Sequence, residues 1–123
     1  MALPISALDL LNKNKIESNR LEFKSGWNPD AIYRSICAFA NDIDNLGGGY
    51  ILVGVEEENG IAKRPVKGLS TSELDQIQKN IVGFNNLIDP FYAPKLSVEE
   101  IDGKQILVLW VPAGAHRPYK VPE

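Results

Sequence analysis

The fold of this chain is decided by residues 48–55, GGYILVGV. Within this stretch, residues 50–55 form a continuous apolar run, which is the pattern of a strand covered on both faces. A second run of six apolar residues, ILVLWV, occupies residues 106–111 and follows an Asp102-Gly103 turn. The residues before that turn alternate between apolar and polar, as in a half-exposed strand. The sequence therefore predicts a hairpin whose second strand is central in a sheet.

Helix signals precede the first apolar run. Asn28 can cap the free N–H groups of a helix, and Pro29 at the first helical position loses no hydrogen bond there. Apolar side chains then repeat at helical spacing through residues 31–41, so this face belongs to the core. Residues 21–24, LEFK, alternate as a short, half-exposed strand, and residues 6–13 are predicted to form a short first helix.

A second helix is predicted between the two apolar runs. Ser70 and Glu73 have the spacing of a capping box, and an apolar face continues from there to Ile88. Before this helix, Asn59-Gly60 suits a tight turn. Residues 61–68 could return as a strand, which Pro65 would confine to an edge of a sheet.

This order of elements predicts an α+β fold, an α/β sandwich. We expect a mixed, mostly antiparallel sheet of about five strands with two or three helices packed on it. The 123 residues suit a single domain, residues 1–123, and no internal repeat interrupts it.

Composition excludes several classes of protein. With 44% hydrophobic and 24% charged residues, the chain is not an intrinsically disordered segment. No apolar run approaches the ~18 residues of a membrane-spanning helix, and the N-terminal residues lack the pattern of a signal peptide. Cys37 is the only cysteine, so no disulfide can form within the chain, and a cytoplasmic location is the simplest interpretation. One cysteine and one histidine cannot build a zinc site of the Cys/His type.

The net charge sets a condition on nucleic-acid binding. Thirteen Lys and Arg against sixteen Asp and Glu give a charge of −3. Domains that bind nucleic acid through overall charge are strongly basic, so here the positive charge would have to be local. One local set lies in residues 114–120, GAHRPYK, where cations flank an aromatic ring; this mixture suits phosphate contacts and base stacking. The candidate nucleic-acid ligands are Lys24, Lys63, Arg64, Lys67, Arg117, Tyr119 and Lys120. Lys24 could instead be the ion-pair partner of Glu22, and charged loops are often only solvated surface.

Acidic residues are the candidates for chemistry. Glu17, Glu22 and the run at residues 56–58 could supply hard oxygen ligands to a divalent metal if separate segments converge. Glu57 follows the predicted central strand, where sheet-built sites often lie. The alternative interpretation is that these carboxylates are simply solvated.

Four residues are interpreted as structural. Gly48 and Gly49 end the linker after the first long helix and let the chain turn tightly, although the backbone of such a run can also face a phosphate. Asn41 could cap the end of that helix or orient a ligand. Gly54 belongs to the predicted central strand.

Taken together, these residues resemble the Schlafen AlbA-like domain, formerly described as a divergent AAA-type domain. The resemblance covers about residues 6–121 and rests on an ordered series: ESNRLEFK at 17–24, ICAFAN at 36–41, GGYILVGV at 48–55, then Asp89-Pro90, Gly103-Lys104 and Arg117-Pro118-Tyr119. It implies a nucleic-acid-binding α/β domain, often the N-terminal part of longer bacterial proteins described as transcriptional regulators or helicase-related. We therefore expect a fragment of a longer chain, with downstream domains as partners.

The resemblance also implies a second activity. In vertebrate Schlafens, three acidic residues support metal-dependent RNA cleavage, and Glu17, Glu22 and Glu57 match them in order, with Glu57 where Asp is usual. The linker at residues 42–46 is longer here than in the vertebrate proteins. No phosphate-gripping Lys lies in a glycine loop, so ATP is not expected as a cofactor.

Three hypotheses follow. The favoured one is a nucleic-acid-binding module of a bacterial transcriptional regulator, with DNA favoured over RNA. The first alternative is a metal-dependent ribonuclease that uses Mg²⁺ or Mn²⁺. The second is a protein-interaction or oligomerisation domain, such as a homodimer.

Overall fold

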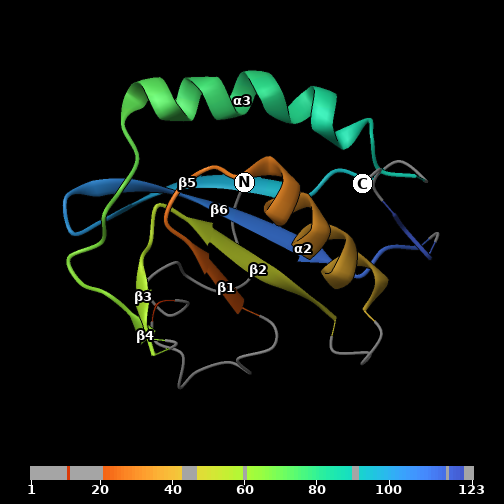
Figure 1. The fold of residues 1–123 in the computed structure, drawn as a ribbon, viewed down its shortest axis with the longest axis horizontal. Coiled ribbons are helices and arrows are strands. Elements are labelled where there is room, and N and C mark those ends of the chain that lie inside the picture. Colours follow the sequence, from red (N-terminus) through yellow and green to blue (C-terminus); the bar gives the residue numbers. More distant parts are fainter. Residues whose placement is uncertain are drawn as a thin grey trace.

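A four-stranded mixed sheet lies at the centre of the molecule, in the order β1-β2-β6-β5 (Figure 1). This computed structural model describes Leu11 and residues 21–42, 47–59, 61–89, 92–115 and 117–120. β1 and β2 are parallel, whereas β2–β6 and β6–β5 are antiparallel. β3 and β4 form a separate two-stranded sheet. In chain order the elements are β1 (Leu21–Lys24), α2 (Pro29–Asn41), β2 (Gly48–Val53), β3 (Glu57–Glu58), β4 (Ile61–Ala62), α3 (Thr71–Asn85), β5 (Lys95–Ile101) and β6 (Lys104–Pro112).

The helices cover one face of the sheet. Alternate residues of the central strands, such as Ile51 and Leu109, pack in one core with the buried faces of α2 and α3. Tyr33 of α2 joins the two helices, because its ring stacks on Phe84 and its hydroxyl donates to the Asn85 side chain at 2.6 Å. Burial raises the pKa of the Tyr33 phenol, so it stays a hydrogen-bond donor.

A second core lies on the other face of the sheet. Leu52 and Val108 point to this side and pack with Phe23 of β1. Ala62 of β4 and Val66 after it cover them. All six residues of β2 are therefore buried, as expected for a strand with packed neighbours on both faces.

The main fold predictions are confirmed. The class is α+β, the strand at residues 48–53 is central, and β6 lies between β2 and β5. Pro29 is in the first turn of α2, and Ser70 and Glu73 form the capping box of α3. The predicted helix at residues 6–13 and the linker at 43–46 lie largely or wholly outside the described residues. Among the described residues, no helix has the length and apolar character needed to cross a membrane.

Three details differ from the prediction. The main sheet has four strands rather than about five, because residues 61–68 give only the two-residue β4. After it, Pro65 has no N–H to donate, and the backbone N–H of Val66 bonds a side chain instead of a strand. α3 ends at Asn85, before Ile88, because Leu87 and Ile88 form tight turns onto Phe84 and Asn85. Asn28 begins α2 without a side-chain capping bond.

Candidate nucleic-acid interface

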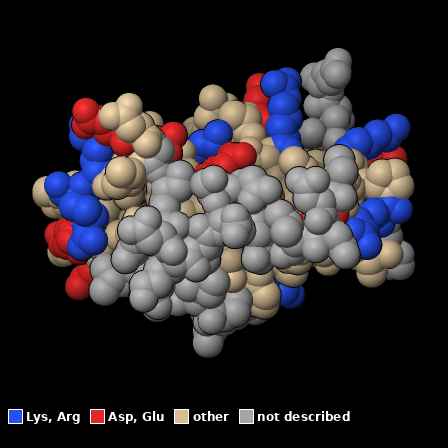
Figure 2. Space-filling view, turned by 90° about the horizontal axis from the view of Figure 1, so that it is seen from below, with Lys and Arg blue, Asp and Glu red and all other residues tan. Residues whose placement is uncertain are grey.

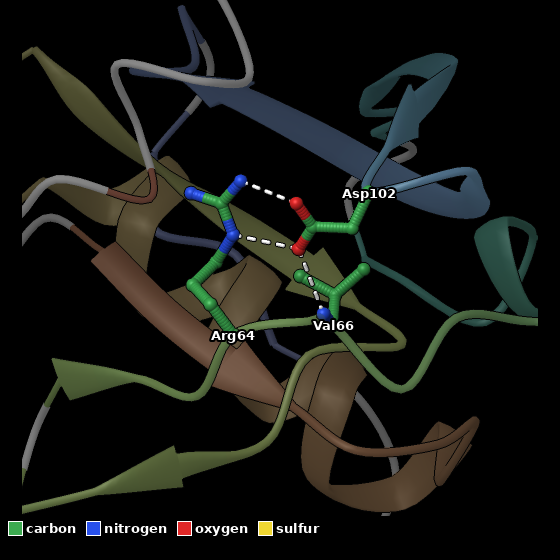
Figure 3. A network of polar contacts seen from close by, with 3 residues as sticks. All are labelled: Arg64, Val66 and Asp102. Atoms are coloured by element: carbon green, nitrogen blue, oxygen red, sulfur yellow. Dashed lines mark hydrogen bonds and ion pairs between the residues drawn. The ribbon is translucent and has the colours of Figure 1, made fainter.

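One end of the molecule is organised by an ion pair between segments far apart in sequence. Arg64 donates to both carboxylate oxygens of Asp102, from Nε at 2.6 Å and from Nη2 at 2.5 Å (Figure 3). The backbone N–H of Val66 donates to Oδ2 of the same carboxylate at 2.9 Å. Asp102 occupies the β5–β6 turn in a left-handed conformation, with φ 57°. The contact therefore ties the β4–α3 connection to this turn.

Exposed cations surround that ion pair. We define the basic end as Lys63, Arg64, Lys67 and Lys104. Lys63 and Lys67 are exposed on the β4–α3 connection, and Lys104 begins β6 immediately after the turn. Lys104 packs closely on the connection, because a Cβ on Gly68 would lie 2.7 Å from its Cβ. An open pocket of about 400 Å³ adjoins this end and is lined by Glu58, Asn59, Ile61, Ala62, Lys63 and Arg64.

The opposite end is built around Asn41, the last residue of α2. Its side-chain amide donates to the Tyr119 carbonyl at 3.0 Å and accepts from the Tyr119 N–H at 2.5 Å. The N–H of Gly114 bonds the Ala40 carbonyl at 2.8 Å, and Lys120 exchanges two backbone hydrogen bonds with Asp89. Asn41 thus holds the closing segment, residues 113–115 and 117–120, against the end of α2.

The three candidate ligands on the closing segment differ in exposure. Arg117 is exposed, and its Nη1 donates to the Asn41 carbonyl at 3.2 Å, where a cation also complements the negative end of the helix dipole. Lys120 is exposed as well. Tyr119 is only 5% exposed, and its ring packs edge-on against Tyr92 at 5.2 Å. The ring of Tyr119 is therefore part of the core, which does not support base stacking at this position.

An open pocket of about 380 Å³ lies beside Arg117, lined by Asn41, Asp42, Arg117 and Pro118. It combines a guanidinium with helix-end polar groups. Figure 2 shows Lys and Arg side chains at both the left and the right end of the molecule, with Asp and Glu side chains beside them. Further Lys and Arg side chains lie between the two ends in this view, so the described cations form separate local groups.

The candidate metal ligands are not brought together among the described residues. Glu22 accepts a hydrogen bond from the Ser35 hydroxyl of α2 at 2.6 Å and lies 3.5 Å from Lys24 Nζ. Glu57 is exposed on β3. The partner strand of β3, β4, packs on the face of the sheet away from α2, whereas Glu22 contacts α2. Glu17 lies outside the described residues. Within the described ranges, no three His, Cys, Asp or Glu side chains are grouped closely enough to hold a metal ion.

The glycines have specific geometric roles. Gly48 has φ 96°, and a Cβ there would lie 1.9 Å from the Val111 carbonyl oxygen. A Cβ on Gly49 would lie 2.5 Å from the ring of Phe39. Gly54 has φ 99° and its carbonyl accepts from the Gly68 N–H at 2.8 Å. Glycine is therefore required at positions 48 and 49 by close packing, and at positions 48 and 54 by the positive φ of the backbone.

Sequence reasoning missed three residues: Asp102 and Lys104 at the basic end, and Ser35, which donates to Glu22 of β1. Asp102-Gly103 was a turn signal, and nothing local in that signal indicates that its carboxylate binds an arginine 38 residues earlier. Ser35 sits on the half-exposed side of a predicted helix, where a serine has no distinguishing pattern.

The molecule is thus a small α+β domain with exposed cations at two ends, and its relatives place it in a family. The family model described as Schlafen, AlbA_2 matches residues 17–123. The chain belongs to this family. No curated protein matches the sequence significantly.

Solved structures that are similar to this chain include the following two. One is the solution structure of the N-terminal domain of a protein from Nitrosomonas europaea described as related to the ATP-dependent DNA helicase RecG. It is 27% identical with a TM-score of 0.72, and the match covers 97% of this chain and 82% of that chain. The other is the crystal structure of the DIP2311 protein from Corynebacterium diphtheriae, 26% identical with a TM-score of 0.55. That match covers 84% of this chain but only 19% of DIP2311.

The Arg64–Asp102 contact makes a prediction about pH. The hydrogen bond from Arg64, supported by the Val66 N–H and by the positive charge of Arg64, lowers the pKa of Asp102 to about 2. Because the pKa is lower in the folded state, the stabilisation is fully present above the ordinary pKa of about 4 and is lost as pH falls toward 2. Asp102→Asn should therefore lower the melting temperature at neutral pH, and this difference from wild type should shrink between about pH 4 and pH 2.

Thermal unfolding monitored by circular dichroism from pH 2 to 8 measures this difference. Asp75→Asn removes a carboxylate from the exposed side of α3 and serves as the control. We expect its melting curve to stay close to wild type across the range. A constant deficit of Asp102→Asn down to pH 2 would contradict the assigned ion pair.

Proposed function

We propose that this chain is a nucleic-acid-binding module and that it prefers DNA to RNA. The observation that carries the proposal is the likeness, over 97% of this chain, to a domain of a protein described as related to a DNA helicase. Membership of the Schlafen AlbA_2 family supports the same class of function. At the finer level, we propose that the module belongs to a longer bacterial transcriptional regulator and acts in the cytoplasm beside its downstream domains.

The ligands we propose are the exposed cations of the two ends. Lys63 and Lys67 at the basic end, and Arg117 and Lys120 on the closing segment, can each contact a backbone phosphate. Arg64 is the weakest of the candidate cations because its guanidinium is already engaged by Asp102. Lys24 is likewise close to Glu22. Affinity is therefore expected to come from local cations, in a protein whose overall charge is −3.

The test measures salt-dependent binding. Fluorescence anisotropy with labelled single- and double-stranded DNA and RNA should give tighter binding to DNA, with an affinity that falls steeply as salt rises. Lys63→Ala/Lys67→Ala and Arg117→Ala/Lys120→Ala should each weaken binding on all sequences alike. Each double variant removes two proposed phosphate contacts and should therefore reduce the slope of log affinity against log salt by roughly 1.8 for duplex DNA.

The matched control removes two exposed cations elsewhere, with Arg34→Ala on α2 and Lys79→Ala on α3. If this control weakens binding as much as both test variants do, the loss reflects net charge and the two ends are not the interface. Absence of binding to every probe would overturn the proposal.

The same samples test the ribonuclease alternative. We would incubate them with and without Mn²⁺ and run the probes on a denaturing gel. Intact probes support a binding module. Mn²⁺-dependent shortening of RNA that Glu22→Gln abolishes would replace it with a metal-dependent nuclease in which Glu17, Glu22 and Glu57 are the proposed ligands.

A further inference from the structure

The outer edge of β5 is a long strand edge without a partner strand in the described part of the chain. β5 is the last strand of the sheet and pairs with β6 through seven consecutive residues without a bulge. Val98, at its middle, is 41% exposed although it is a large apolar residue. Among the described residues this edge has no partner strand, and a regular edge of this length is a template for pairing with another strand.

The turn after β5 determines which backbone groups face outward. Asp102 and Gly103 both have positive φ, 57° and 73°, which is the conformation of a two-residue type I′ hairpin turn. In such a turn the flanking residues, Ile101 and Lys104, form a hydrogen-bonded pair. Because these pairs alternate along an antiparallel ladder, every second residue of β5 directs its N–H and C=O away from β6. The outward-directed residues are Leu96, Val98 and Glu100.

The sequence of this edge is complementary to itself. Consider an antiparallel copy of β5 related by a two-fold axis at Ser97. Lys95 then lies opposite Glu99 of the partner copy, and Leu96 lies opposite Val98 of the partner copy, each pair occurring twice. Lys95 and Glu99 share one face of the strand and Leu96 and Val98 share the other, so opposite charges meet on one face and apolar side chains on the other.

Other registers lack this match. An axis at Val98 places Leu96 opposite Glu100 of the partner copy, and an axis at Glu99 places like charges together. If the axis lies between two residues, each residue with outward-directed N–H and C=O groups lies opposite a residue whose groups face β6, and the hydrogen-bonded ladder cannot form. With the axis at Ser97, Leu96 and Val98 form hydrogen-bonded pairs, and the Ser97 hydroxyl already donates to the Glu99 carboxylate beside the axis.

We propose that β5 pairs with β5 of a second copy of this chain, with the axis at Ser97, to give one continuous eight-stranded sheet. The interface is isologous and closes on itself, so it forms a dimer and not a fibre. Five paired residues on each strand make a small interface, so the dimer should dissociate on dilution. This inference does not depend on nucleic-acid binding, and its test contains no nucleic acid.

Sedimentation equilibrium over a range of protein concentrations tests the register. Wild type should show reversible dimerisation. Glu99→Lys places two lysines opposite each other twice, and we expect about a tenfold weaker dimer. The control is Glu100→Lys, which makes the same change in charge on the neighbouring residue but outside the five matched positions, so its affinity should stay close to wild type.

Mixing two variants gives the decisive result. Lys95→Glu and Glu99→Lys should each be mainly monomeric alone, whereas an equimolar mixture restores both opposite-charge pairs and should dimerise. Circular dichroism melting of each variant establishes that it is folded. A wild-type monomer at all concentrations, equal loss in Glu99→Lys and Glu100→Lys, or no dimer in the mixture would each overturn the proposal.

Discussion

Gly48→Ala is expected to prevent stable folding. A Cβ at this position would lie 1.9 Å from the Val111 carbonyl oxygen and 2.9 Å from the Ala113 nitrogen, and both atoms belong to the backbone. Residue 48 also has φ 96°, a conformation that L side chains rarely adopt. The clash falls on the Gly48–Pro112 pair at the end of the β2–β6 ladder, between the two central strands, so relieving it requires these backbones to separate there. We expect a loss of more than about 4 kcal/mol in the free energy of unfolding, measured by urea denaturation.

A second glycine provides the control for Gly48→Ala. Gly83 lies within α3, and a Cβ there would meet no atom within 4 Å. Gly83→Ala should therefore stabilise the protein by about 0.5–1 kcal/mol, since alanine favours the helix. A folded Gly48→Ala protein of wild-type stability would show that the β2–β6 backbones are not packed as described.

Asn41→Ala should give the second largest effect. It removes both hydrogen bonds between the Asn41 side chain and the Tyr119 backbone, leaving a half-buried N–H and C=O without that partner. We expect a loss of roughly 1–3 kcal/mol in the free energy of unfolding, because the two groups are no longer satisfied by the amide. Faster amide exchange at Tyr119, measured by NMR, would locate the loss in the closing segment.

Asn28→Ala is the matched control for Asn41→Ala. Asn28 precedes α2 in extended conformation, but its side chain makes no capping hydrogen bond. Its removal should therefore change stability by less than about 0.5 kcal/mol. Equal losses in Asn28→Ala and Asn41→Ala would contradict the role given to Asn41.

The affinity for nucleic acid in Asn41→Ala tests whether the closing segment belongs to the interface. Arg117 donates to the backbone carbonyl of Asn41, which the substitution retains, but the segment that carries Arg117 loses its side-chain attachment. If the closing segment is part of the interface, affinity should fall in Asn41→Ala at temperatures where the protein is still folded.

The parts of the fold that were predictable are those with local signals. Residues 50–53 and 106–111 are apolar without interruption, and that pattern depends on burial of both faces of each strand. The Asp102-Gly103 turn and the Ser70–Glu73 capping box are fixed by a few neighbouring residues, and both are present. The parallel pairing of β1 with β2 has no such signal, because it depends on packing across α2.

The candidate site was less predictable because its contacts are distant in sequence. Asn41 reaches Tyr119 across 78 residues, and Arg64 reaches Asp102 across 38. The polar composition of residues 114–120 suggested an exposed tyrosine, whereas Asn41 anchors that segment and the Tyr119 ring is buried against Tyr92. The exposure of side chains in a short polar segment depends on the hydrogen bonds that fix its backbone. These bonds involve residues distant in sequence, so the composition of the segment does not predict them.

Strands β2 and β6 separate the two cores. Alternate side chains of these strands pack with α2 and α3 on one face of the sheet and with Ala62 and Val66 on the other face. Opening of α3 would expose side chains on one face of the sheet, whereas on the other face Ala62, Val66 and Leu11 would remain packed. Opening of one covering layer therefore need not expose the apolar side chains that face the other layer.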